Sequence, residues 1–165
     1  MKHIALSAVL TLVTAPAFAD LEVTFKEGAP KDRFTLTNLS ACPIGPADVT
    51  IDLAGSDAGL IFDVTGAGAG VEVFQPFDLV AGQDAVAAFT PVRDGDNALT
   101  LRLDKLGEGE EVAFTIDVDD TVGTREITVS RSEISGASVR LDMAGSSFDA
   151  VFTEASNVRV PLAPC

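Results

Sequence analysis

The sequence predicts an all-β protein, a single two-sheet antiparallel β-sandwich of the immunoglobulin-like kind. Apolar and polar residues alternate with a period of two along most of the chain, and residues that favour turns separate the alternating segments. Such alternation is typical of strands with one buried and one solvent-facing side. Many short strands with turns between them indicate a sandwich or a barrel. A jelly roll is the alternative architecture.

Seven segments alternate clearly enough to be assigned as strands, and we expect eight to ten strands in all. No long stretch has helical periodicity. The seven segments are residues 21–26, 34–37, 49–53, 99–103, 112–118, 127–129 and 139–141. The chain has no Trp and no Tyr, so the core depends on aliphatic residues and Phe. The expected core residues are Val23, Phe25, Phe34, Leu36, Val49, Ile51, Leu53, Leu99, Leu101, Leu103, Phe114, Ile116 and Ile127.

Glycine, proline and aspartate mark the turns between these strands. They gather at residues 28–31, 43–46, 66–70, 94–97 and 107–109. The glycine-rich segment 66–70 is not a dinucleotide-binding loop, because Val71 stands where the third glycine of that motif belongs and no helix follows. We interpret it as a loop between strands.

Residues 1–19 have the features of a cleavable secretory signal peptide. A positively charged start precedes an apolar run over residues 4–13, and Ala17 and Ala19 put small residues before the expected cleavage site. The apolar run is shorter than the roughly 20 residues that cross a bilayer. We therefore expect a secreted or periplasmic protein whose mature part, residues 20–165, is one β-sandwich domain without a transmembrane segment.

The chain is strongly acidic, with 25 Asp and Glu, 11 Lys and Arg, and a net charge of −14. Nucleic-acid binding needs a positively charged surface, so this charge argues against it. It also argues against binding to anionic membranes. Divalent cations, cationic partners and simple solubility are all compatible with it.

Two cysteines, Cys42 and Cys165, lie in the predicted mature domain. An even number of cysteines in an exported protein favours one disulfide. The Cys42–Cys165 bridge would tie the C-terminus to the body of the domain. Two free thiols are the alternative.

Most catalytic chemistry is absent from the expected mature domain. His3 is the only histidine, and it would leave with the signal peptide. Without imidazole, the serine and cysteine hydrolase triads and histidine-based zinc sites are excluded. Carboxylate catalysis stays open, but glycosidases usually also carry aromatic platforms for sugar rings. We expect a protein that is not an enzyme.

Clustered aspartates are the best candidate site. Asp117, Asp119 and Asp120 lie at the end of a strong strand, Asp63 ends another, and residues 94–97 form an acidic turn. We expect Asp117 and Asp119 to share the solvent-facing side of their strand, because they are two residues apart. Calcium prefers clustered carboxylate oxygens, so Asp117, Asp119 and Asp120 are the predicted Ca²⁺ ligands. Solvated acidic loops without a metal are the alternative.

Three stretches of the chain resemble a group of small exported bacterial proteins that are described as similar to the core protein of the marine sponge aggregation factor. The stretches are residues 27–34, 59–77 and 114–120. The resemblance covers most of the mature domain. It implies a secreted protein with a calcium-dependent role in cell adhesion.

Three functions follow as hypotheses. The first is an exported binding or adhesion module that contacts a protein or another cell-surface macromolecule, with calcium at its acidic loops. The second is a structural or accessory envelope subunit that pairs with a partner through an edge strand. The third is a carboxylate-based hydrolase, which requires two acids across a cleft. The oligomeric state stays open.

Overall fold

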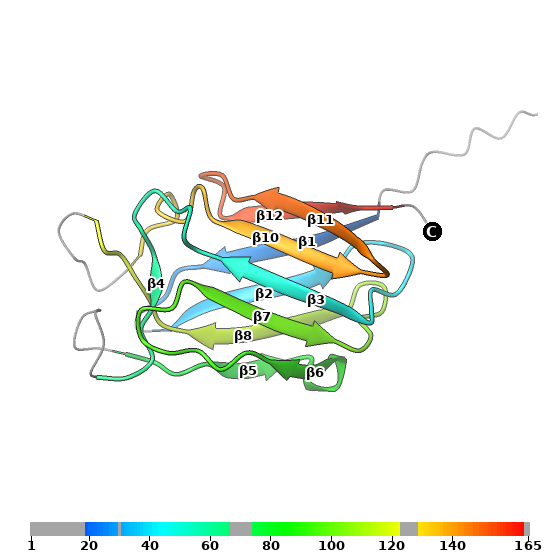
Figure 1. Ribbon diagram of the computed structural model, residues 1–165, viewed down its shortest axis with the longest axis horizontal. Coiled ribbons are helices and arrows are strands. Elements are labelled where there is room, and N and C mark those ends of the chain that lie inside the picture. Colours follow the sequence, from blue (N-terminus) through cyan, green and yellow to red (C-terminus); the bar gives the residue numbers. More distant parts are fainter. Residues whose placement is uncertain (1–18, 30, 67–73, 123–128, 164–165) are drawn as a thin grey trace, which may run out of the picture.

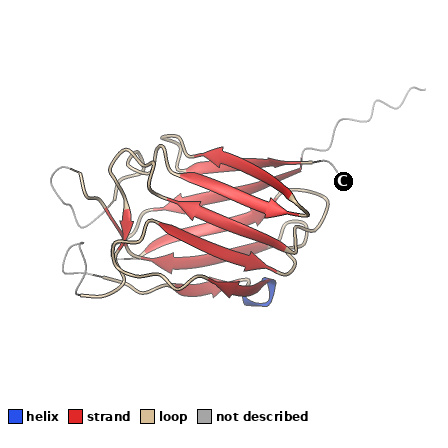
Figure 2. Cartoon of the chain, viewed as in Figure 1, coloured by secondary structure: helices blue, strands red, loops and turns tan. Residues whose placement is uncertain are grey.

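The computed structural model describes residues 19–29, 31–66, 74–122 and 129–163, and these form a two-layer β-sandwich (Figure 1; Figure 2). The strands are β1 (Ala19–Lys26), β2 (Asp32–Asn38), β3 (Ala47–Asp52), β4 (Ile61–Phe62), β5 (Asp78–Ala81), β6 (Val86–Phe89), β7 (Ala98–Leu103), β8 (Glu111–Ile116), β9 (Val118–Asp119), β10 (Ser138–Met143), β11 (Ser146–Val151) and β12 (Asn157–Leu162). One short 3₁₀ helix, η1 (Gln83–Ala85), accompanies them.

Two five-stranded sheets face each other. One has the strand order β12-β1-β2-β8-β5 and the other β11-β10-β3-β7-β6, and each neighbouring pair is antiparallel. The prediction of an all-β, two-sheet antiparallel sandwich is confirmed. A third pairing, between the two-residue strands β4 and β9, lies at one end of the sandwich (left in Figure 1).

The chain turns from one sheet into the other between β5 and β6. Gly82 makes this corner possible, because its φ of +72° lies in the left-handed region that favours glycine. A Cβ atom at Gly82 would also lie 2.3 Å from the carbonyl oxygen of Glu111 on β8. The η1 turn follows at once and leads the chain into β6.

The core lies between the sheets and is built from the inward-facing residues of both. Twelve of the thirteen predicted core residues are buried, and the thirteenth, Ile127, lies outside the described residues. A row of phenylalanine rings runs through this core to an edge of the sandwich. Neighbouring rings in the order Phe25, Phe34, Phe114, Phe77 and Phe89 have centroids 5.0, 5.1, 5.0 and 4.3 Å apart. Offset and tilted ring pairs at such distances add to the stabilisation from burial.

Among the described residues, three ion pairs cross neighbouring strands on the outer faces. They join Asp48 to Arg102, Arg140 to Asp149 and Glu22 to Arg159, and in each pair the two residues are directly opposite in register. Opposite charges at such positions support the register, although exposed pairs each stabilise a fold by only about 0.2–1 kcal/mol.

Five of the seven predicted strands are confirmed with small changes in their ends. The predicted strand over residues 112–118 is instead two strands, because β8 ends at Ile116 and β9 begins at Val118. Of the predicted strand over 127–129, only Val129 is described, and it is buried outside any strand. Strands β5, β6, β11 and β12 were not predicted, and all four lie at sheet edges. None of the residues in β5, β6 and β11 is buried, whereas β12 buries Val158 and Val160 in alternation with exposed residues.

The loop after β2 is held by a buried asparagine. The Asn38 side-chain amide donates to the carbonyl oxygens of Cys42 at 2.8 Å and Leu106 at 2.9 Å. Its Oδ1 accepts from the backbone N–H and the hydroxyl of Ser40. No cysteine within the described ranges is a free thiol. Cys165 lies outside those ranges, so the Cys42–Cys165 pairing stays a prediction.

None of the helices in the described part of the chain is long and apolar enough to cross a membrane. Residues 1–18, which hold most of the predicted signal peptide, lie outside the description, and β1 begins at Ala19.

Candidate functional site

The short ribbon of β4 and β9 brings two distant aspartates together. Ile61 pairs with Asp119 and Phe62 with Val118. The next step of the same register is a hydrogen bond at 3.1 Å from the Asp63 N–H to the Asp117 carbonyl oxygen. Side chains directly opposite in an antiparallel pair project from the same side, and so do residues two apart. The backbone therefore places Asp63, Asp117 and Asp119 on one side of the ribbon.

These aspartates are buried, which corrects the prediction that Asp117 and Asp119 face solvent. Asp63, Asp117 and Asp119 are 1%, 3% and 2% exposed. After Ile116 the chain leaves the sheet of β8 and pairs with β4 instead, so Val118 on the opposite side is buried as well. The segment around Gln75 adds further cover, because its backbone bonds to Asp63 and to Asp117.

A fourth aspartate, Asp32 at the start of β2, joins the cluster and is also buried. Its Oδ1 accepts a hydrogen bond from the Gly28 N–H at 2.9 Å, and its Oδ2 accepts one from the Val118 N–H at 3.0 Å. Asp32 therefore links β2 to β9 with both carboxylate oxygens. We call Asp32, Asp63, Asp117 and Asp119 the acidic cluster.

Burial and repulsion from neighbouring carboxylates raise the pKa values of Asp32, Asp63 and Asp117. Burial raises the pKa of Asp117 to about 7, and the charges of Asp119, Asp32 and Asp63 add to this. Burial likewise raises the pKa of Asp32 to about 7, against the lowering effect of its two backbone hydrogen bonds; the charges of Asp119 and Glu27 contribute further. The pKa of Asp63 rises to about 6, mainly through burial and then through Asp119 and Asp94.

Two carboxylate oxygens of the cluster accept no hydrogen bond. They are Oδ1 of Asp63 and Oδ2 of Asp117, both buried. Buried polar atoms are nearly always satisfied, and an unsatisfied one destabilises the fold. The side chains of Asp63 and Asp119 lie within hydrogen-bonding reach of each other, which for two carboxyl groups requires a shared proton. The cluster thus concentrates carboxyl groups in the interior, and two of its oxygens have no hydrogen-bond donor beside them.

Asp94 holds the chain just after β4. Its Oδ1 accepts from the N–H groups of Val64 at 2.8 Å and Thr65 at 2.7 Å, and its Oδ2 accepts from the Thr65 hydroxyl. The hydrogen bond from Thr65 is the main cause that lowers the pKa of Asp94. Asp94 therefore stays charged, and it positions the segment that carries Asp63.

The predicted ligands Asp117, Asp119 and Asp120 are only partly brought together. Asp117 and Asp119 meet Asp63 and Asp32, a partner that sequence reasoning missed. Asp120 is buried, but the charges that raise the pKa values of Asp63 and Asp117 come from other residues. Within the described ranges, no three acidic side chains are already arranged as the ligands of a metal ion. The cluster would have to rotate its side chains to surround a cation.

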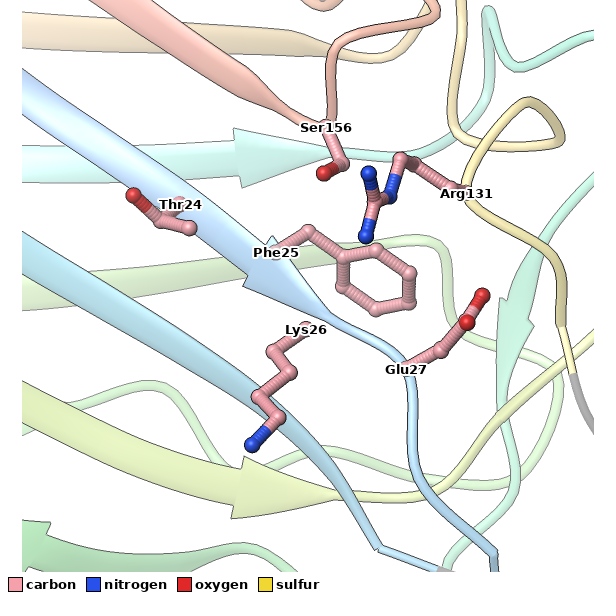
Figure 3. Close-up of a pocket in the computed structure, with 6 residues that line it drawn as sticks. All are labelled: Thr24, Phe25, Lys26, Glu27, Arg131 and Ser156. Carbon is pink, nitrogen blue, oxygen red and sulfur yellow. The ribbon is translucent and has the colours of Figure 1, made fainter.

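Other cavities are lined by different residues. One of about 330 Å³ is lined by Thr24, Phe25, Lys26, Glu27, Arg131 and Ser156. Figure 3 shows the side chains of Arg131 and Glu27 around the Phe25 ring, and all three residues line this cavity. Another, of about 340 Å³, includes the carboxylates of Asp57, Glu133 and Glu154. Asp63 and Asp117 line neither cavity, and their burial withholds them from a substrate.

Comparison with known proteins adds no relative. No protein-family model, no curated protein sequence and no solved structure matches this chain.

Proposed function

We propose that this protein is an exported binding module that acts in adhesion at the cell surface or envelope, and that its binding depends on calcium. The observation that carries the proposal is the acidic cluster, in which Asp63 and Asp117 each keep one buried oxygen without a hydrogen-bond donor. A divalent cation would satisfy both oxygens and offset the repulsion among the carboxylates.

Three further features support this role. The predicted signal peptide sends the chain to compartments where calcium is plentiful, and a weak site with a Kd of about 0.1–1 mM suffices there. The resemblance to exported aggregation-factor-like proteins implies calcium-dependent adhesion. The buried acids also fit a binding role better than hydrolysis, because hydrolase carboxylates must reach their substrate.

The experiment is a retention assay on the native cell envelope. Tagged protein is incubated with envelopes from its own source in 2 mM Ca²⁺ or in EGTA, and the bound fraction is measured after washing. We expect retention in calcium and at least a fivefold loss in EGTA. Equal retention in both buffers contradicts the calcium-dependent module and favours an accessory envelope subunit that binds without a metal.

The matched control is the Asp57→Asn variant. Asp57 lies in the separate acidic cavity with Glu133 and Glu154, so its loss removes one negative charge without touching the acidic cluster. We expect this variant to be retained in calcium like the unmodified protein. If this variant lost as much retention as the unmodified protein loses in EGTA, the calcium dependence would not come from the acidic cluster.

A further inference from the structure

We infer that Asp63, Asp117 and Asp119 form a calcium site at the end of the sandwich, and that Asp32 positions this site without being a ligand. The inference rests on the calcium dependence proposed above and names the residues responsible. It replaces Asp120 of the sequence-based ligand set with Asp63.

The backbone fixes the relative positions of these aspartates. The 3.1 Å hydrogen bond from Asp63 to Asp117 continues the β4–β9 register, so these two residues are fixed opposite each other by the main chain. Asp119, two residues further, projects from the same side of the ribbon. Asp120 lies beyond the end of β9, and its charge is not among those that raise the pKa of Asp63 or Asp117.

Two carboxylate oxygens of the proposed site lack a hydrogen-bond donor. Asp63 and Asp117 are both more than nine-tenths buried, and each has one oxygen without a donor. Both side chains feel the charge of Asp119, so the three carboxylates share one region of the interior. A cation in that region would meet the two oxygens of Asp63 and Asp117 that accept no hydrogen bond.

Asp32 differs because both of its oxygens are already engaged. They accept the N–H groups of Gly28 and Val118, whereas Asp63 and Asp117 each keep one oxygen with no donor. Its bond to Val118 holds β9 against β2. Asp32 is therefore a positioning residue.

The ligand type favours calcium over magnesium. Calcium accepts flexible sets of six to eight oxygens, whereas magnesium requires near-octahedral geometry and gives up its water molecules reluctantly. A buried set of carboxylates that must rotate to meet the ion suits the first and not the second.

Calorimetric titration of the purified protein with CaCl₂ tests the site. We expect one Ca²⁺ per chain, at least tenfold weaker binding in Asp63→Asn and Asp117→Asn, and less than a twofold change in Asp120→Asn and Asp57→Asn. MgCl₂ should bind at least tenfold more weakly than CaCl₂. No binding to the unmodified protein at several millimolar Ca²⁺ overturns the site, and so does a larger loss in Asp120→Asn or Asp57→Asn than in the two cluster variants. Equal binding of magnesium overturns the preference for calcium.

A second measurement does not depend on the variants folding. Europium(III) replaces calcium at oxygen sites, and its luminescence lifetimes in H₂O and D₂O report the number of bound water molecules. We expect a buried site with few waters and displacement of the europium by Ca²⁺. A lifetime near that of the free aqua ion overturns the inference.

The two proposals fail in different ways. If calcium binds through Asp63 and Asp117 but EGTA does not change envelope retention, the calcium site is supported and the calcium-dependent adhesion function is contradicted. If retention depends on calcium but both cluster variants keep the calcium affinity of the unmodified protein, the adhesion function is supported and the site is contradicted.

Discussion

The N–H of Asp63 donates a hydrogen bond to the carbonyl oxygen of Asp117 at 3.1 Å, and the side chains of both residues are buried. The two residues are 54 positions apart in the sequence and meet only because β4 pairs with β9. This contact places like charges side by side in the interior. Several properties of the metal-free protein follow from that conflict.

The metal-free protein should be more stable at pH 5 than at pH 8. The folded pKa values of about 7, 7 and 6 for Asp32, Asp117 and Asp63 are raised above the ordinary value of 3.8. Between pH 4 and pH 7 the folded state therefore binds more protons than the unfolded state, so the free energy of unfolding falls as pH rises. The stability from these protonated carboxyl groups is fully present below about pH 4 and is lost as pH rises through 6–7. Urea denaturation in EDTA from pH 5 to pH 8 measures it.

Other carboxyl groups near the cluster also affect this pH profile, so a variant without two of the buried aspartates serves as the control. Asp119, Glu27 and Asp94 face these groups. The lowered pKa of Asp94 acts in the opposite direction, and its effect is smaller because Asp94 is partly exposed to solvent. The double variant Asp63→Asn/Asp117→Asn should flatten the profile. A denaturation midpoint that rises from pH 5 to pH 8 in the unmodified protein contradicts the prediction.

Replacing Asn38 by alanine should destabilise the fold by about 2–4 kcal/mol. The buried side chain makes four hydrogen bonds, and its loss leaves the carbonyl oxygens of Cys42 and Leu106 without this donor. Chemical denaturation measures the difference. Asn157→Ala, at an exposed asparagine in β12, is the control and should change stability by less than about 0.5 kcal/mol. Equal effects of the two substitutions would show that Asn38 does not hold its loop.

The two ends of the phenylalanine row should respond differently to truncation. Phe114→Ala leaves a cavity in the middle of the core and should destabilise the protein by about 3–5 kcal/mol. Phe89 is 47% exposed at the edge, so Phe89→Ala should lower stability by less than about 1 kcal/mol. Thermal and urea unfolding compare the two variants. A Phe89→Ala loss as large as that of Phe114→Ala would mean that the edge pairing with Phe77 is part of the core.

A disulfide between Cys42 and Cys165 should form in the exported protein. Intact mass under non-reducing conditions should be about 2 Da below that of the reduced chain, and a peptide that links the two cysteines should appear after digestion. Closing a loop of this length stabilises a fold by up to about 5 kcal/mol in the chain-entropy model. Two alkylated cysteines without prior reduction would exclude the bridge.

Export should leave a mature chain that starts at Asp20. N-terminal sequencing of the protein recovered from periplasm or medium measures this. The n-region, apolar run and Ala17–Ala19 site set the position. Recovery of the uncleaved chain in the cytoplasm alone would contradict export, and with it the calcium-rich setting of the proposed site.

The alternation of residues such as Val49, Ile51 and Leu53 was enough to predict the central strands and the core. Each of these residues is buried, because side chains two residues apart along a strand point to the same face of the sheet, and here that face lies against the core. Edge strands such as β6 were missed because only part of their surface is covered, so no alternation is required of them.

The acidic cluster shows what residue spacing along the chain cannot predict. The spacing of Asp117 and Asp119 correctly indicated one shared side, but the environment of that side was predicted wrongly. Asp32 stands at the start of an ordinary strand, and nothing local to it signals a contact with β9. Its role depends on a hydrogen bond between residues 86 positions apart.

The sequence by itself determined the class of fold, the core and the chemistry that is absent from the predicted mature domain, because these depend on composition and on short-range periodicity. Only the tertiary structure decided which aspartates meet and that they are buried. The pairing of β4 with β9 is a long-range contact, and burial of a carboxyl group depends on what other segments place over it. For that reason the candidate site is not the three aspartates within residues 117–120 but a cluster drawn from three parts of the chain.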